Sequence, residues 1–162
     1  MERWDDQLRE DHQALEAQVG ALEAALKIDV AASERRTALR WIVRTLGPAL
    51  GMHLKREEET LFPALEELSG KETGAIEILK EQHRELRLAL KNLATLLENL
   101  DPMDWEGIAV AGQGIVDLLE DHERKEDHLL INVLDSSLKP QELTALARGF
   151  QKAAWKAYSE QL

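Results

Sequence analysis

The chain contains no cysteine. Disulfide bonds and thiolate-bound metals are therefore excluded, and any metal ion would have to be held by His, Asp or Glu side chains. Aromatic residues make up only 4% of the sequence, and it has neither an alternating run of β-branched residues nor an Asn-Gly turn. Because these features mark strands and hairpins, no β-sheet is predicted.

Positive charge is also scarce, with 20 Lys and Arg against 31 Asp and Glu and a formal net charge of −11. Without a basic stripe to contact phosphates, the chain is not expected to bind nucleic acid. Long apolar runs are missing too, both as a membrane span of roughly 18 residues and as the core of a signal peptide. We therefore expect no membrane association and a cytoplasmic protein.

Helical periodicity is what the sequence does contain. Its 162 residues, 44% of them apolar, predict a single domain over residues 1–162. Apolar residues recur every three or four positions in four long segments within about residues 3–137, and again over about 140–161. Long helices with short connections predict an all-α fold, an up-down antiparallel four-helix bundle with an additional C-terminal helix. That helix is expected to cover the bundle end, and the alternative is a homodimer contact.

The expected helix ends follow from capping residues. Ser33 is predicted to cap the second helix, and Ser69-Gly70 to end it. The turn LDPMDW offers Asp101 or Asp104 as the cap of the fourth helix, and Pro140 suits the first turn of the last one.

The sequence repeats itself. The segment HLKREEETLFPAL (residues 53–65) aligns with HERKEDHLLINVL (residues 122–134) at an offset of 69. The first and third predicted helices match as well, since His12 and His83 are each followed by apolar residues at +3, +7, +10 and +14. Each half of the chain is thus a helix pair with one His on its first helix and H-x-x-x-E on its second. The matched motif residues are His53 with His122 and Glu57 with Glu126.

This pattern predicts a metal site inside the bundle. Residues four apart lie on one helix face, and the neighbouring apolar residues place all four histidines on core-facing stripes. Buried carboxylates without partners cost several kcal/mol each, and no basic residue occupies matching core positions in both halves. One core histidine is usually satisfied by a backbone carbonyl. Four at equivalent places, two of them followed by Glu at +4, favour a pair of metal ions instead.

Other polar residues near the motifs are predicted to lie outside the cluster. His128 is six residues from His122 and falls on a different helix face. Glu58 and Asp127 follow their histidines by five residues, and Glu123 follows His122 directly, so all three should point away on a regular helix.

Two common metal motifs are absent. The sequence has no H-E-x-x-H, which excludes a zincin-type protease. It also lacks the E-x-x-H of ferritin-like di-iron bundles, because no histidine of the repeat has a Glu three residues before it. The residues at that position are Arg9, Leu50, Lys80 and Leu119.

The order H…H-x-x-x-E…H…H-x-x-x-E, with EEE-x-LFPAL after the second histidine, resembles the hemerythrin-like (HHE cation-binding) family over about residues 8–135. The resemblance implies a non-haem di-iron centre, two iron ions with an oxo or hydroxo bridge, that binds O2 or related small molecules. It implies no separate catalytic residue. The implied ligands are His12 and His53 on one iron, His83 and His122 on the other, and Glu57 and Glu126 as bridges.

The sequence departs from the oxygen-carrying members in two ways. Those carriers have a fifth histidine four residues along the third helix, where this chain has Leu79 and Arg87 on either side of His83. They also place the last bridging carboxylate five residues after its histidine, the spacing of Asp127, whereas Glu126 fits the internal repeat and is the expected ligand. Four imidazoles and two carboxylates leave two ferrous ions positive and under-coordinated, so an anionic bridge and an open position are expected.

Three functions fit these residues. The first is a binder or sensor of O2, nitric oxide, peroxide or iron, without turnover. The second is a di-iron oxidase or peroxidase. The third is an interaction bundle with a vestigial metal site. The first is preferred here.

Overall fold

The computed structural model describes residues 3, 5–69, 74–99, 104–128 and 132–159, with the side chains of residues 69, 132, 135 and 154–159 excepted. All regular structure in these ranges is helical. The helices are α1 (Asp6–Lys27), α2 (Ala32–Arg56), the π-helix η1 (Glu57–Leu61), α3 (Phe62–Ser69), α4 (Gly74–Glu98), α5 (Trp105–Glu126), α6 (Asn132–Ser137) and α7 (Pro140–Ser159).

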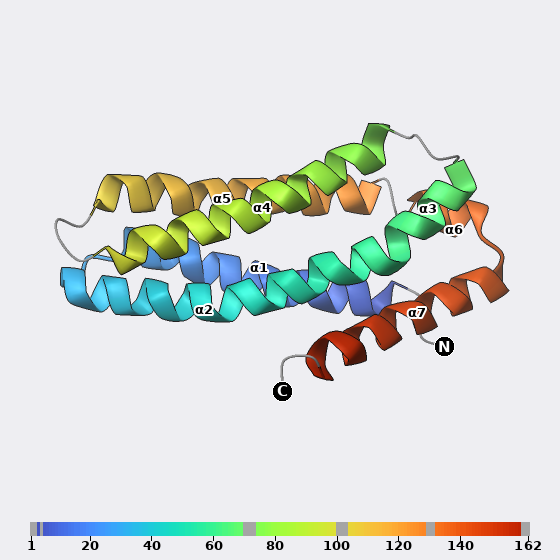
Figure 1. Cartoon of the computed structure of the whole chain (residues 1–162), viewed down its shortest axis with the longest axis horizontal. Coiled ribbons are helices and arrows are strands. Elements are labelled where there is room, and N and C mark those ends of the chain that lie inside the picture. Colours follow the sequence, from blue (N-terminus) through green and yellow to red (C-terminus); the bar gives the residue numbers. More distant parts are fainter. Residues whose placement is uncertain (1–2, 4, 70–73, 100–103, 129–131, 160–162) are drawn as a thin grey trace.

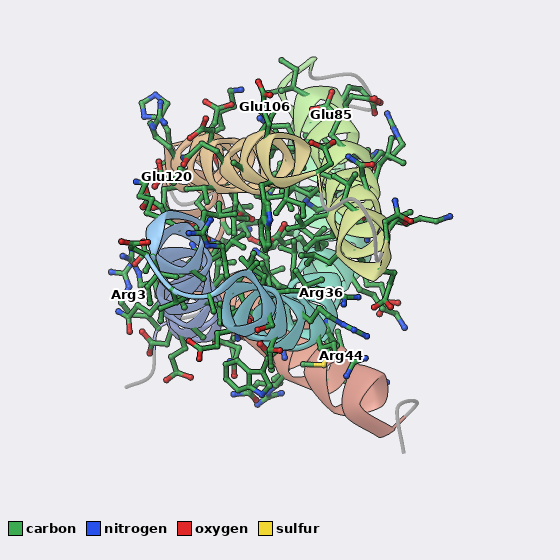
Figure 2. All side chains as sticks on the ribbon, turned by 90° about the vertical axis from the view of Figure 1, so that its left-hand side faces the viewer. Arg3, Arg36, Arg44, Glu85, Glu106 and Glu120 are labelled. Carbon is green, nitrogen blue, oxygen red and sulfur yellow. The ribbon has the colours of Figure 1, made fainter. Side chains whose placement is uncertain are left out.

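Four long helices form the predicted antiparallel bundle (Figure 1). α1 packs against α2 and α5, and α4 packs against the same two helices. Viewed along the bundle, the labelled side chains of Glu85, Glu106 and Glu120 lie on its outside (Figure 2). The predicted all-α bundle with an extra C-terminal helix is thus confirmed. None of the described helices is both long and apolar enough to cross a membrane.

The helix ends agree only in part with the predicted caps. The Asp104 carboxylate accepts a hydrogen bond of 2.8 Å from the Gly107 N–H and caps α5, as predicted. The prediction for Ser33 is wrong, because α2 begins at Ala32 and its N-cap, Ala31, offers no side-chain acceptor. α7 begins at Pro140, whose missing N–H would have no intrahelical partner there. Asp101 and Gly70 lie outside the described residues.

The core consists of two apolar clusters. The larger one joins all four long helices at the end where α1 meets α2 and α4 meets α5, and it includes Leu22, Leu39 and Leu97. The smaller one lies at the opposite end, where Phe62 of α3 and Phe150 of α7 are buried. Along the chain, each of the four histidines falls between residues of the larger and the smaller cluster, so any site built from these histidines is closed by apolar side chains at both ends.

The C-terminal helix α7 covers the end of its own bundle. It packs against η1, α2 and α1, and it contributes Leu146 and Phe150 to the smaller cluster. The spacing of apolar residues in this helix predicts that Leu143, Leu146 and Phe150 are buried; Leu146 and Phe150 are, whereas Leu143 is half-buried. The side chain of Trp155, which the periodicity predicts to join them, lies outside the described residues.

Candidate metal centre

Four helices and η1 bring the six predicted ligands together in the bundle interior. His12 comes from α1, His53 from α2 and His83 from α4, while Glu57 begins η1. α5 contributes His122 and Glu126 near its end. His12 is 6% exposed and the other five are at most 1% exposed, so the cluster is sealed from water except beside His12.

The Glu57 carboxylate lies between the two pairs of histidines. Its Oε1 is 2.6 Å from Nε2 of His53. Its Oε2 is 2.9 Å from Nε2 of His83 and 3.5 Å from Nε2 of His122. Each oxygen therefore faces a different pair, which is the arrangement that a carboxylate bridging two metal ions requires.

Glu126, not Asp127, faces the histidines from the second motif. Oε2 of Glu126 is 3.1 Å from Nε2 of His12 and 3.8 Å from Nε2 of His122. Asp127 is 56% exposed on its side chain, and its Oδ1 is 3.8 Å from Nδ1 of His12, the far side of the ring. The geometry thus favours Glu126, which the internal repeat pairs with Glu57, as the candidate ligand.

The candidate ligand atoms fall into two groups, in each of which they lie within 4.8 Å of one another. The rings within each helix-spanning pair are close, with centroids 4.9 Å apart for His12 and His53 and 4.9 Å apart for His83 and His122. The two groups share one carboxylate. The first group is His12, His53, Glu57 and Glu126, and the second is Glu57, His83 and His122.

Several buried polar atoms of the cluster have no hydrogen-bond partner within the described part of the chain. They are both ring nitrogens of His53 and His122, Oε1 of Glu57 and Oε1 of Glu126. Nε2 of His53 is close to Glu57, but the pair lacks the alignment of a hydrogen bond. Because buried polar atoms are almost always paired, this many exceptions in one place need an explanation. Imidazole nitrogen and carboxylate oxygen are ligand atoms that iron and zinc accept. Bound metal ions would therefore explain why these atoms lack partners within the chain.

The charges of the cluster also fit a cation. Burial by itself would lower the pKa of His53 and raise that of Glu57, but their mutual attraction reverses both shifts, so the pKa of His53 lies well above and that of Glu57 well below its ordinary value. Glu126 differs, because burial and then the negative charge of Glu57 raise its pKa. Two buried carboxylates therefore repel each other, and a metal ion between them would remove that cost.

The prediction that Glu58 points away from the cluster is wrong. The N–H of Phe62 bonds to the carbonyl of Glu57, five residues back, which widens the helix just after the motif. Glu58 lies in this turn, and its Oε1 is 2.7 Å from Nδ1 of His83 on α4. Arg87 holds the same carboxylate with two hydrogen bonds of 2.8 and 3.0 Å. The chain is also π-helical at 127–128, so the turn recurs after the second motif.

A local signal for this turn is present in the sequence. Pro63 has no N–H to offer the carbonyl of Glu59, which favours a change of hydrogen-bond pattern in this segment. The partner of Glu58 could not be read in the same way, because His83 lies on a different helix. Carboxylates that bind the far nitrogen of a metal-ligating histidine fix its tautomer and orientation. Glu58 is thus a functional residue that sequence reasoning missed.

His53 has a more distant carboxylate beside its far nitrogen. Oδ2 of Asp11 is 3.8 Å from Nδ1 of His53, and it is also bound by the buried Arg56. Gln7 donates to the second oxygen of Asp11 at 3.2 Å. Sequence reasoning missed Asp11 and Arg56 as well, because each lies one position away from a ligand and is brought to this side by packing.

Two further residues near the second motif, His128 and Glu123, lie outside both groups of candidate ligands. His128 is exposed, as expected for a residue outside the cluster. Glu123 belongs to neither group of candidate ligands, as predicted, but its side chain is buried between α1 and α5, and burial raises its pKa to about 7. The pKa of Glu123 is lowered by nearby histidines and raised by the negative charge of Glu16, and burial outweighs both effects.

Comparison with known proteins agrees with this geometry. Residues 5–134 match the model of the hemerythrin HHE cation-binding domain, which covers most of the chain. No curated protein and no solved structure gives a match. The family match and the buried His and Glu groups together indicate a metal-binding site. The chain belongs to the hemerythrin HHE cation-binding family.

Proposed function

We propose that this chain is a non-haem di-iron protein that binds or senses O2 or a related small ligand such as nitric oxide or peroxide. His12 and His53 would hold one iron and His83 and His122 the other. Glu57 and Glu126 would bridge them. The observation that supports this assignment best is the Glu57 carboxylate, which presents one oxygen to each pair of histidines.

The donor set suits iron. Four neutral imidazoles and two carboxylates offer six ligand groups to two ions, which leaves positions open for a small molecule. Bound iron would supply a redox-active centre that takes up such a ligand. The residues of the chain would hold the ions, keep water out through the two apolar clusters, and orient the ring of His83 through its hydrogen bond with Glu58.

A second function, oxidation or peroxide turnover, is favoured by one observation. A surface cavity of about 590 Å³ is lined by His12, so molecules larger than a diatomic gas have room beside one of the candidate ligands. Steady consumption of peroxide by the iron-loaded protein would support this function, and stoichiometric binding without turnover would support the first.

The decisive experiment compares metal content and optical spectra of three proteins purified from iron-fed cells: wild type, the double variant His53→Ala/His122→Ala, and His128→Ala. The last is a matched control, because His128 is an exposed histidine outside both ligand groups. About two irons per chain and a near-ultraviolet band of a bridged ferric pair are expected in wild type and control. Both should be lost in the double variant. A wild type that folds equally well and binds no metal would contradict the proposal.

A further inference from the structure

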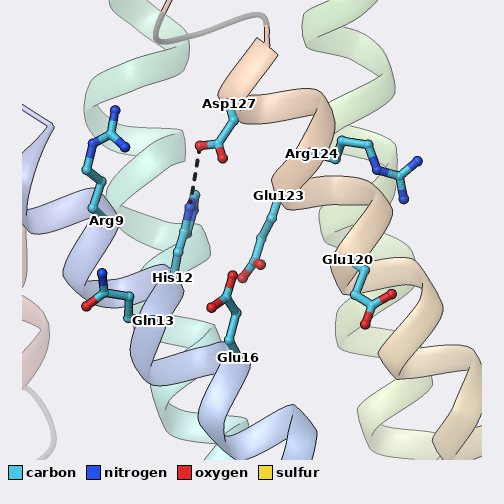
Figure 3. A pocket seen from close by; sticks show the side chains of 8 residues that line it. All are labelled: Arg9, His12, Gln13, Glu16, Glu120, Glu123, Arg124 and Asp127. Atoms are coloured by element: carbon cyan, nitrogen blue, oxygen red, sulfur yellow. Dashed lines mark ion pairs between the residues drawn. The ribbon is translucent and has the colours of Figure 1, made fainter.

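The cavity beside His12 lies between α1 and the end of α5 (Figure 3). Carboxylates dominate its lining, with Glu16 from α1 and Glu120, Glu123 and Asp127 from the α5 side. These four carboxylates outnumber the two arginines of the lining, of which Arg9 is also paired with Asp5, outside the lining, at 2.6 Å. The cavity is therefore negative, and it ends at the most exposed of the six proposed ligands.

Glu123 is the unusual residue of this cavity. Its side chain is only 8% exposed, and its Oε1 has no hydrogen-bond partner among the residues that the structure describes. It points into the cavity toward Glu16, which comes from the facing helix (Figure 3). Neither Glu16 nor Glu120 forms an ion pair with any described residue. A buried carboxylate that faces a second carboxylate is costly unless a cation or a proton joins them.

The internal repeat provides a built-in comparison. Interface α1–α5 corresponds to interface α4–α2, and at the matching positions Leu54 replaces Glu123 and Arg87 replaces Glu16. There Leu54 is fully buried, and Arg87 closes the surface by binding Glu58. One face of the bundle is thus sealed by an apolar residue and an ion pair, while the equivalent face is open and carries unpaired acids.

We propose that Glu16 and Glu123 form an accessory site for a hydrated divalent cation, through which metal ions enter the buried cluster at His12. This inference rests on the proposed function, since it assumes that the cluster takes up metal. Two carboxylates are the ligands that a hard divalent ion accepts while it keeps most of its waters. Six waters need about 180 Å³ at about 30 Å³ each, well within the cavity.

The site is suited to passage and not to storage. Only two carboxylates face each other, and neither belongs to the two groups of close ligand atoms, so the buried cluster should bind the ion more tightly. A negative cavity raises the local concentration of cations and speeds their association, by tenfold or more in favourable cases. Removal of the two acids should therefore slow metal uptake without changing how much metal is finally bound.

The test follows Co2+ uptake by the full-length metal-free protein in a stopped-flow instrument under anaerobic conditions, using the visible absorption of Co2+. The variant Glu16→Gln/Glu123→Gln is compared with wild type and with Glu85→Gln/Glu106→Gln, which removes the same charge from exposed positions elsewhere. The first variant is expected to load about fivefold more slowly or worse and still reach the wild-type Co2+ content. The control should load within about twofold of wild type.

The outcomes separate this inference from the proposed function. Equal loading rates in all three proteins would overturn the entry site and leave the metal centre intact. A folded Glu16→Gln/Glu123→Gln protein that never reaches the wild-type content would also overturn it, because the residues would then belong to the final site. If wild type binds no Co2+, the proposed function fails. Should the double variant not fold, Glu16→Gln alone changes only an exposed residue, and an unchanged loading rate there would overturn the proposal.

Discussion

The two halves of this chain present the same candidate ligands in different surroundings. In the first, Glu57 lies within 3.5 Å of three histidines, whereas in the second Glu126 comes that close only to His12. Each motif residue has a counterpart in the other half of the chain, but the side chains that surround the two counterparts differ. The ligand pattern is therefore common to both halves, and the differences between them determine which candidate ligand is central and which face is open.

The outer partners differ in the same way. Glu58 reaches Nδ1 of His83 at 2.7 Å, while the matching Asp127 remains 3.8 Å from Nδ1 of His12. Leu54 fills the position that Glu123 occupies in the second half. Variants at matched positions of the two halves can therefore be compared, to distinguish residues that metal binding requires in both halves from residues that act in only one.

The largest effect is expected from Glu57→Gln, compared with Glu126→Gln. Because Glu57 belongs to both groups of ligand atoms, its loss should remove both metal ions, with affinity falling by more than the roughly 10–100-fold that the loss of an outer partner typically costs. Glu126→Gln should weaken chiefly the site of His12 and His53 and leave about one ion bound. Metal analysis after dialysis against a chelator measures both. Equal losses in the two variants would show that the halves are equivalent.

Leu54→Ala and Glu123→Leu should change stability in opposite directions. Leu54 is fully buried in the larger apolar cluster, and its truncation should lower the free energy of unfolding by about 2–5 kcal/mol. Glu123→Leu replaces a buried, unpaired carboxylate and should raise that free energy by about 1 kcal/mol. Urea unfolding of the metal-free proteins at pH 7 measures both. Destabilisation by Glu123→Leu would mean that the carboxylate has a structural partner.

Glu58→Gln should weaken metal binding more than Asp127→Asn does. Removing the carboxylate that orients a metal-bound histidine typically costs about 10–100-fold in affinity. Asp127 is too far from its histidine for a hydrogen bond, so its variant should stay within about threefold of wild type. Competition with a chromogenic chelator gives both affinities. The reverse order would place the important outer carboxylate in the second half.

The smallest effect is expected from Arg87→Gln. The ion pair of Arg87 and Glu58 is partly exposed, and such pairs contribute about 0.2–1 kcal/mol. Metal affinity should fall by fivefold at most, and the loss should shrink in high salt because the pair is screened. The same chelator assay at low and high salt provides the test. A loss as large as that of Glu58→Gln would make Arg87 an essential part of the orienting pair.

Much of the fold and of the candidate cluster follows from periodicity. In a regular helix the spacing of apolar residues determines which face is buried, so helical spacing alone predicts the interior positions of His12, His53, His83 and His122. The repeat adds the second carboxylate, because Glu126 occupies the position that Glu57 has in the first half. Whether these residues bind iron stays a prediction.

The sequence by itself therefore determined the four long helices, the repeat and the six polar residues that face the core. Each follows from the spacing of residues within a helix or from the match between the two halves. Only the tertiary structure decided the partner of Glu58, the burial of Glu123 beside Glu16 and the packing of α7 on η1. The first depends on the approach of α4, which brings Nδ1 of His83 within 2.7 Å of Glu58. The other two depend on contacts between helices far apart in the chain, and helical spacing carries no information about which neighbours meet.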